Sequence, residues 1–257
     1  MKLTVLGGAA AGGNPGQGCA GYYVETDAAR LVLDLGPGTL QELRRHTDYR
    51  TLDAVVISHL HLDHVLDLGA LRFALAYNPV PPPGKIPLWL PPGGLAVVRQ
   101  FGQAFHEERE GPDFFASVFD LAEYDPAQPL RINDAVLTFH PTVHYVPCWA
   151  MRVSTGAGGD LTYTADAGPA SNLAPFAAGS ALLVSEATLL EPTAEPYETR
   201  GHMTAAEAAE IARDAEAGKL LLAHMWAELG FASYAAEAAR VFPGAVELAE
   251  PGLSVTW

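Results

Sequence analysis

The hydrophobic residues of the chain follow two recurring patterns, short apolar runs and longer stretches with helical spacing. The short runs, bounded by turn residues, predict strands at 2–6, 21–26, 30–35, 53–57, 86–90, 130–139, 148–155, 160–165, 181–187, 219–224, 244–249 and 252–256. The stretches with apolar residues three and four positions apart predict helices at 38–46, 65–77, 93–108, 205–217 and 232–241. Strands dominate each half and helices recur between them. The pattern therefore predicts an α/β (α+β) fold with two sheets and outer helices, rather than a simple doubly wound sheet.

The length of 257 residues allows one or two domains, and the pattern favours one. Apolar residues make up 49% of the chain, which is enough for one large core. The proline-rich stretch 79–85 is the one candidate boundary, but a strand pattern follows it at once, so we interpret it as a surface loop. We therefore expect a single domain that spans 1–257.

The charge balance limits the class of partner. The formal net charge is −15 and the isoelectric point is near 4.9. Affinity for long nucleic acids depends on Lys and Arg side chains that neutralise phosphates, so this composition argues against electrostatic capture of a polyanion. Two divalent metal ions would offset only part of the charge.

The number of cysteines and the hydropathy of the chain indicate in which cellular compartment we expect the protein. Cys19 and Cys148 are too few for a disulfide framework, which fits a reducing cytoplasm. The apolar N-terminus after Lys2 imitates a short signal peptide, but Gly7 and Gly8 interrupt it and it is better interpreted as a first strand. No apolar run reaches the roughly 18 residues of a membrane span. We expect a cytoplasmic protein without a membrane segment, and a homodimer is compatible with the sequence.

The most informative segment follows the apolar run 53–57 and carries four metal-ligating side chains within six positions: His59, His61, Asp63 and His64. Where the chain is still extended, residues two apart project to the same side, so the first two imidazoles can hold one ion. A turn into a helix would aim the other two side chains at a second ion. Imidazole and carboxylate ligands suit zinc first and iron or manganese next. The alternative is a solvated histidine-rich turn.

Three further residues, His144, Asp166 and His224, follow strand-like segments later in the chain. Side chains at strand ends are held rigidly, and the ends of several strands can converge on one site. A single histidine of this kind is more often a structural residue than a ligand. Together with the first cluster, these residues complete two coordination spheres. The remaining candidates, His46, His106 and His140, are interpreted as surface or structural residues.

These seven residues, in this order, resemble the metallo-β-lactamase fold superfamily. The resemblance implies an αββα four-layer sandwich with the metals at one edge between the sheets. It implies that His59, His61 and His144 hold one metal, that Asp63, His64 and His224 hold the second, and that Asp166 bridges both. Residues 34–39, DLGPGT, also resemble the early Asp-x-Gly-x-Gly turn of the superfamily, so the resemblance runs nearly from end to end.

A narrower resemblance comes from residues 201–209, GHMTAAEAA. Thr204 and Glu207 predict a capping box at the start of the helix 205–217, which places His202 just before a helix N-terminus, and Gly218 is expected to close that helix. With residues 185–188, SEAT, this segment resembles the tRNase Z-like phosphodiesterase branch. That resemblance implies that His202 lies beside the scissile phosphate and that Glu186 orients it. The alternative is that 201–202 form only a loop.

The chain also departs from the enzymes of that branch that process tRNA. Those enzymes carry a basic arm between the positions that match His144 and Asp166, whereas here only 21 residues separate the two and two predicted strands occupy them. Pro37 replaces the usual acidic residue of the Asp-x-Gly-x-Gly turn, and Trp226 follows His224 where the tRNA enzymes usually differ. Structured tRNA is therefore not the expected substrate.

One other motif, at residues 16–21, could indicate a dinucleotide-binding loop or a tight turn. Residues 16–21, GQGCAG, satisfy the pattern of a dinucleotide-binding loop, but a strand pattern follows them where such a loop needs a helix. We prefer a tight turn that lets backbone approach the site.

We therefore expect a metal-dependent hydrolase with two divalent ions, zinc first and manganese or iron as options. A metal-bridging hydroxide would act on a small or single-stranded phosphodiester, with Asp63, His202 and Glu186 as catalytic residues. One alternative is hydrolysis of a lactone, thioester or other carbonyl compound on the same metals. A second alternative is a metal-bearing scaffold that binds a metabolite or partner without turnover. His202 distinguishes the phosphodiesterase from the carbonyl hydrolase, because a carbonyl hydrolase needs no imidazole on the phosphate side.

Overall fold

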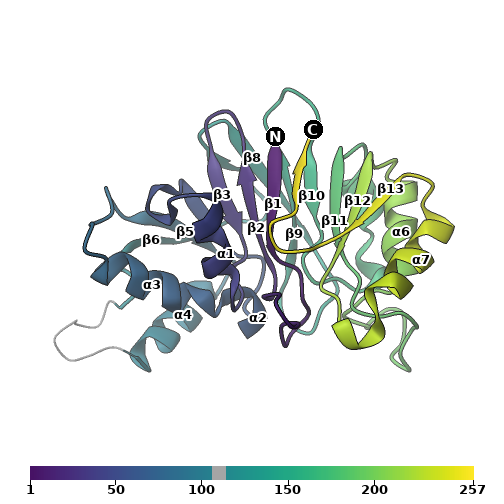
Figure 1. Ribbon diagram of the computed structural model, residues 1–257, viewed down its shortest axis with the longest axis horizontal. Helices are drawn as coiled ribbons and strands as arrows, with labels where there is room; N and C mark the ends of the chain where they lie inside the picture. Colours follow the sequence, from purple (N-terminus) through teal and green to yellow (C-terminus); the bar gives the residue numbers. More distant parts are fainter. Residues whose placement is uncertain (106–113) are drawn as a thin grey trace.

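Two seven-stranded sheets pack face to face in the computed structural model, which describes residues 1–105 and 114–257 (Figure 1). The first sheet has the order β14 (Ser254–Thr256), β1 (Lys2–Gly7), β2 (Gly21–Glu25), β3 (Arg30–Leu33), β4 (Ala54–Val56), β5 (Ile86–Leu90), β6 (Phe119–Glu123). The second has the order β13 (Ala245–Leu248), β12 (Lys219–Ala223), β11 (Leu182–Glu186), β10 (Leu161–Tyr163), β9 (Trp149–Ser154), β8 (Ala135–Pro141), β7 (Leu130–Ile132).

Each sheet has an antiparallel part and a parallel part. Strands β14, β1, β2 and β3 pair antiparallel, and β3 to β6 continue in parallel. The second sheet repeats this arrangement, with β7 to β10 antiparallel and β10 to β13 parallel. Parallel neighbours need crossover connections, and helices supply most of them. The carboxyl ends of the parallel strands therefore gather at one edge of each sheet.

Helices cover the two outer faces, so the expected αββα sandwich is confirmed (Figure 1). The helices are α1 (Thr39–His46), α2 (Leu62–Val65), α3 (Asp67–Tyr77), α4 (Gly94–Gln103), α5 (Leu173–Phe176), α6 (Ala205–Asp214) and α7 (Phe231–Val241). Helices α1, α3 and α4 pack on the first sheet, and α6 and α7 pack on the second. No helix among the described residues is long and apolar enough to cross a membrane.

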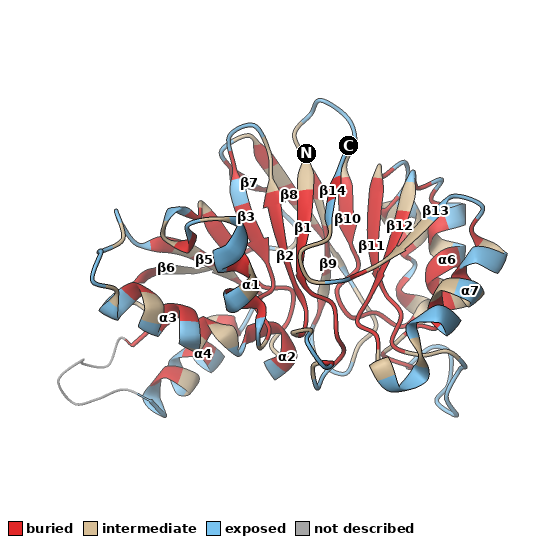
Figure 2. Cartoon of the chain, in the orientation of Figure 1, coloured by how far each residue is buried: buried red, intermediate tan, exposed pale blue. Residues whose placement is uncertain are grey.

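The main core lies between the sheets and takes residues from both, such as Leu31, Val56 and Leu221. Strands β4 and β11 are buried along their whole length, and β3 is buried except at Arg30. The outer helices turn buried sides to the sheets and exposed sides to solvent (Figure 2). Burial on both faces explains why these strands read as continuous apolar runs in the sequence, without alternation. Cys19 and Cys148 are buried and unpaired, as small core residues.

Several element predictions were wrong in detail. The strand predicted at 130–139 is the hairpin β7–β8, whose two-residue turn places Asn133 at a φ of 52°. Strand β6 was not predicted, because Asp120 and Glu123 break the apolar run of this edge strand. The helix predicted at 93–108 ends at Gln103 in the structure, and its last predicted residues, with His106, lie outside the described residues.

The expected closing role of Gly218 is also wrong. Helix α6 ends at Asp214, and Glu216, not Gly218, takes the left-handed conformation, with a φ of 51°. Gly218 is needed for a different reason, because a Cβ at this position would lie 2.8 Å from the carbonyl oxygen of Ala181. The capping box of Thr204 and Glu207 is present as predicted.

Candidate metal centre

All seven residues that the sequence singled out as metal ligands come together at the carboxyl ends of the strands. His59 and His61 follow β4, and Asp63 and His64 lie in α2, the short helix at the lower edge between the two halves in Figure 1. The others come from the second sheet: His144 follows β8, Asp166 follows β10 and His224 follows β12. The fold therefore places ligands from both sheets at one edge, as strand topology predicts for such sites.

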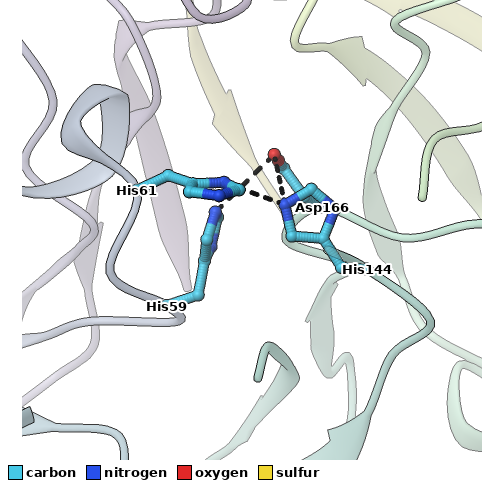
Figure 3. Close-up of side chains that lie close together, drawn as sticks. All are labelled: His59, His61, His144 and Asp166. Carbon is cyan, nitrogen blue, oxygen red and sulfur yellow. Dashed lines mark hydrogen bonds and ion pairs between the residues drawn. The ribbon is translucent and has the colours of Figure 1, made fainter. Parts of the chain in front are cut away.

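The first cluster consists of His59, His61, His144 and Asp166. One ligand atom from each lies within 4.8 Å of all the others. His144 Nε2 is 3.0 Å from His61 Nδ1 and 3.6 Å from Asp166 Oδ2. Figure 3 shows the three imidazole rings gathered around the Asp166 carboxylate. Two of the rings come from the segment after β4, and the third, His144, follows β8 of the other sheet. This cluster can hold one ion.

The second cluster consists of Asp63, His64, Asp166 and His224, which meet the same 4.8 Å limit. His224 Nε2 is 3.1 Å from Asp63 Oδ2, and His64 Nε2 is 3.3 Å from Asp166 Oδ1. Ligand atoms that each sit about 2.1 Å from a tetrahedral zinc ion lie about 3.4 Å from one another, so the observed spacings suit such an ion. Asp166 belongs to both clusters, which places it between the two candidate sites.

Three buried atoms of these clusters make no hydrogen bond: His59 Nε2, His64 Nε2 and Asp166 Oδ1, although the last two lie 3.3 Å apart. A buried polar atom without a partner costs about 1–3 kcal/mol, so each atom needs a ligand that the protein chain does not supply. All three point into the clusters. A pair of divalent ions fits these residues, and the all-nitrogen and oxygen donor set suits zinc, iron or manganese.

Outer hydrogen bonds fix which nitrogen three of the histidines present. His64 Nδ1 donates to Asp34 Oδ2 at 2.8 Å, and His144 Nδ1 donates to the carbonyl oxygen of Gly201 at 2.9 Å. His224 Nδ1 lies 2.7 Å from the hydroxyl oxygen of Thr188. Each bond leaves Nε2 facing the cluster. Such outer bonds set the tautomer and orientation of metal-binding histidines.

Asp34 supports the second cluster through a contact that the sequence did not reveal. It is fully buried and accepts hydrogen bonds from the Ser58 amide, the Ser58 hydroxyl, His64 and the Tyr163 hydroxyl, all at 2.7–2.8 Å. Its φ of 57° is a left-handed conformation that a non-glycine residue adopts only when its surroundings hold it there. The Asp-x-Gly-x-Gly turn was the available signal, but the contact with His64 links residues that are 30 positions apart.

The electrostatics favour neutral imidazoles in the first cluster and an ionised Asp63 carboxylate in the second. Burial lowers the pKa of His59 well below its usual value, and it also lowers the pKa values of His61 and His144. Burial opposes ionisation of Asp63, but hydrogen bonds from His224 and His64 outweigh it and lower the pKa of the carboxyl group. His64 is the exception: burial opposes its protonation, but the Asp166 and Asp34 carboxylates outweigh burial and raise the pKa of the imidazole. Metal ions require neutral imidazoles and ionised carboxylates as ligands, so a bound ion would displace the proton of His64.

His202 lies beside both clusters without belonging to the seven. Its ring stacks on His224, with 5.5 Å between the ring centroids, and its Nδ1 is 2.9 Å from Glu186 Oε1. Burial opposes protonation of His202, but the Glu186 carboxylate prevails and raises the pKa of the imidazole to about 9. Because Nδ1 faces Glu186, Nε2 is the nitrogen that can face a substrate.

Glu186 is itself fixed. It is buried and accepts hydrogen bonds from the Ala167 amide at 2.8 Å, the Thr188 amide at 3.1 Å and the Thr188 hydroxyl at 2.6 Å. The predicted pairing of Glu186 with His202 is therefore present as a contact.

The other residues and motifs that the sequence analysis considered lie outside the two clusters. His46 pairs with Glu42 and His140 bonds to the carbonyl oxygen of Ser171. Residues 16–21 run from a turn at Gly16, with a φ of 77°, into β2, so no helix opens where a dinucleotide loop needs one. Between His144 and Asp166 the chain forms β9 and β10, without a protruding arm.

Comparison with known proteins places the chain among metal-dependent hydrolases. Residues 29–225 match the family described as the beta-lactamase superfamily domain. A Bacillus subtilis (strain 168) protein named probable metallo-hydrolase YhfI is 32% identical over 256 residues, which cover 98% of both chains. The crystal structure of YhfI, a metallo-beta-lactamase fold protein, superposes with a TM-score of 0.84 at 29% identity and covers 99% of both chains.

Two other relatives are more distant. A ribonuclease Z of Ignicoccus hospitalis is 27% identical over 300 residues, which cover 94% of each chain. The crystal structure of a diphosphatase from the PhnP family has a TM-score of 0.72 and 21% identity, and covers 100% of this chain and 97% of the other. At that identity the second likeness shows the fold alone.

Proposed function

The chain belongs to the metallo-β-lactamase fold superfamily, in its tRNase Z-like branch, and is a metal-dependent hydrolase; from this premise we propose that it is a phosphodiesterase. We propose a small or single-stranded phosphodiester as the substrate. The observation that carries this proposal is the pair His202 and Glu186, an imidazole that a buried carboxylate holds at 2.9 Å beside the metal clusters but outside the ligand set.

The metal assignment is the first part of the proposal. His59, His61 and His144 would hold one divalent ion, Asp63, His64 and His224 the second, and Asp166 both. The unpartnered atoms His59 Nε2, His64 Nε2 and Asp166 Oδ1 support it. Zinc is the first choice, with manganese or iron as options. When bound, the two ions would act as Lewis acids on a phosphate oxygen and make water acidic enough to attack near neutral pH.

The chain's own residues would do the rest. Asp63, besides ligating, would accept a hydrogen bond from the attacking water and orient it toward phosphorus. His202 would donate through Nε2 to a phosphate oxygen that gains charge, or to the leaving oxygen. Glu186 would hold the ring so that Nε2 and not Nδ1 faces the substrate, since Nδ1 is 2.9 Å from its carboxylate.

The ribonuclease Z relative supports phosphodiester chemistry, and two features favour a small substrate over tRNA. The segment between His144 and Asp166 is used by β9 and β10 and forms no arm, and the net charge of −15 repels a polyanion. A cytoplasmic location and a homodimer stay predictions.

A substrate panel tests the proposal. Purified protein loaded with zinc or manganese should hydrolyse bis(p-nitrophenyl) phosphate and unactivated dinucleoside monophosphates with a higher kcat/KM than lactones and thioesters. Higher kcat/KM on lactones or thioesters would instead support the carbonyl hydrolase. Full metal content with no turnover of any ester would support the non-catalytic scaffold.

A further inference from the structure

An exposed aromatic ring stands at the rim of the metal centre. Tyr145 directly follows His144, and its side chain is exposed, with 54% of the residue accessible to solvent. Its ring centroid lies 5.2 Å from that of His144 and 5.7 Å from that of His202. The ring is therefore next to one cluster and next to His202, for which this inference takes the second of the two roles proposed above, donation to the leaving oxygen.

The ring is held at both ends, although much of it faces solvent. Its hydroxyl donates to Glu195 Oε2 at 2.7 Å. Its carbon atoms lie directly over Gly201, where a Cβ would come within 2.7 Å of the ring, so the glycine is what permits this position. Ordering an exposed side chain costs conformational entropy. A ligand that binds the exposed face of the ring would offset this cost.

The surroundings of the ring restrict what can lie on it. Glu195 is exposed, and its carboxylate accepts a hydrogen bond from the ring's hydroxyl. A leaving group with a second phosphate on this ring would meet the Glu195 carboxylate, and like charges repel. An uncharged planar group meets no such penalty, and aromatic faces bind nucleobases by stacking without regard to sequence.

We infer that Tyr145 is a specificity-determining residue, a stacking platform for a nucleobase on the leaving side of the diester. The substrate class is then a diester of a single phosphate whose leaving alcohol is a nucleoside without further phosphates. This inference rests on the proposed phosphodiesterase activity and names the substrate class of the same site. Tyr145 binds the leaving group and takes no part in proton transfer.

Two matched diesters test this inference. Both carry deoxyadenosine on the retained side, and the leaving side is either deoxyadenosine or an abasic deoxyribose. Steady-state kinetics of the zinc-loaded wild type, Tyr145→Ala and Tyr145→Phe are compared, with product analysis to show which ester bond breaks. Tyr197→Ala is the control, because Tyr197 is 56% exposed on the same loop and bonds to the carbonyl oxygen of Pro169 instead.

Tyr145→Ala should raise KM about tenfold for the diester with the leaving base, which is the typical effect of losing one base–aromatic stack, and leave kcat nearly unchanged. The abasic diester should change by less than about twofold. Tyr145→Phe keeps the ring and should stay close to wild type. Binding of free deoxyadenosine, followed by calorimetry, should weaken in Tyr145→Ala and not in Tyr197→Ala.

Two results overturn this inference alone. One is an equal loss on both diesters, which would make Tyr145 only a support for His144 and His202. The other is a phenylalanine variant as impaired as the alanine variant. A wild type that cleaves neither diester but turns over lactones or thioesters would overturn the proposed function, and this inference with it.

Discussion

Replacing His202 by alanine isolates the residue on which the phosphodiesterase assignment depends. The fold should tolerate the change, because Glu186 keeps hydrogen bonds from the Ala167 amide, the Thr188 amide and the Thr188 hydroxyl. The metal ligands should also be unaffected, since His224 Nδ1 is held by Thr188 and His144 Nδ1 by the Gly201 carbonyl. The variant therefore removes one imidazole and leaves the clusters in place.

The expected loss is about 100-fold in kcat on an unactivated diester, the usual size of a missing general acid or charge-stabilising donor. That factor corresponds to about 2.7 kcal/mol of transition-state stabilisation. KM should change little, because the interaction is strongest in the transition state. An activated p-nitrophenyl diester should lose less, since its leaving group needs no proton.

The assay pairs kinetics with metal content and thermal unfolding. His140→Ala is the matched control, because His140 bonds to the Ser171 carbonyl and stacks on Phe176, and it is not among the cluster residues. The control should keep wild-type kcat. A His202→Ala variant that keeps wild-type turnover on the unactivated diester, or that loses metal, would refute the reasoning.

Two further predictions concern the outer bonds and the substrate. Asp34→Ala should weaken metal affinity by about 10–100-fold, because His64 loses the carboxylate that orients it; competition with a chelator measures the change, and unchanged affinity would contradict the role of Asp34. Precursor tRNA should be cleaved with a lower kcat/KM than a small diester at both low and physiological salt, since net charge repels polyanions more as salt falls; efficient 3′-end cleavage at both salt concentrations would contradict this.

The clustering of the seven candidate ligands was predictable because they are dense in the sequence or follow strand patterns. His59 and His61 are two positions apart, and Asp63 and His64 fall where the chain turns into α2, so local geometry alone brings these four together. The capping box at Thr204 was likewise a local signal that placed His202 at the start of α6. The other three candidates, His144, Asp166 and His224, could be selected because each is a metal-ligating residue type that follows a predicted strand.

What the sequence did not reveal depends on contacts between distant segments. Asp34 reaches His64 across 30 positions, and Tyr145 reaches Glu195 across 50. No local pattern marks such pairs. Strand β6 was missed for a different reason: it lies at the edge of its sheet, so solvent exposure allows the charged Asp120 and Glu123 that disguise it. The end of α6 was misplaced because Glu216 accepts the left-handed conformation usually assigned to glycine.

The most direct test of the central claim is the metal content of the purified protein, measured by elemental analysis for wild type and His224→Ala. The wild type should hold close to two divalent ions per chain, because the seven ligands exceed what one tetrahedral site can use. The variant should keep the ion between His59, His61, His144 and Asp166 and lose the other. A wild type that binds a single ion even in excess zinc, with the same content in His224→Ala, would contradict the dinuclear centre.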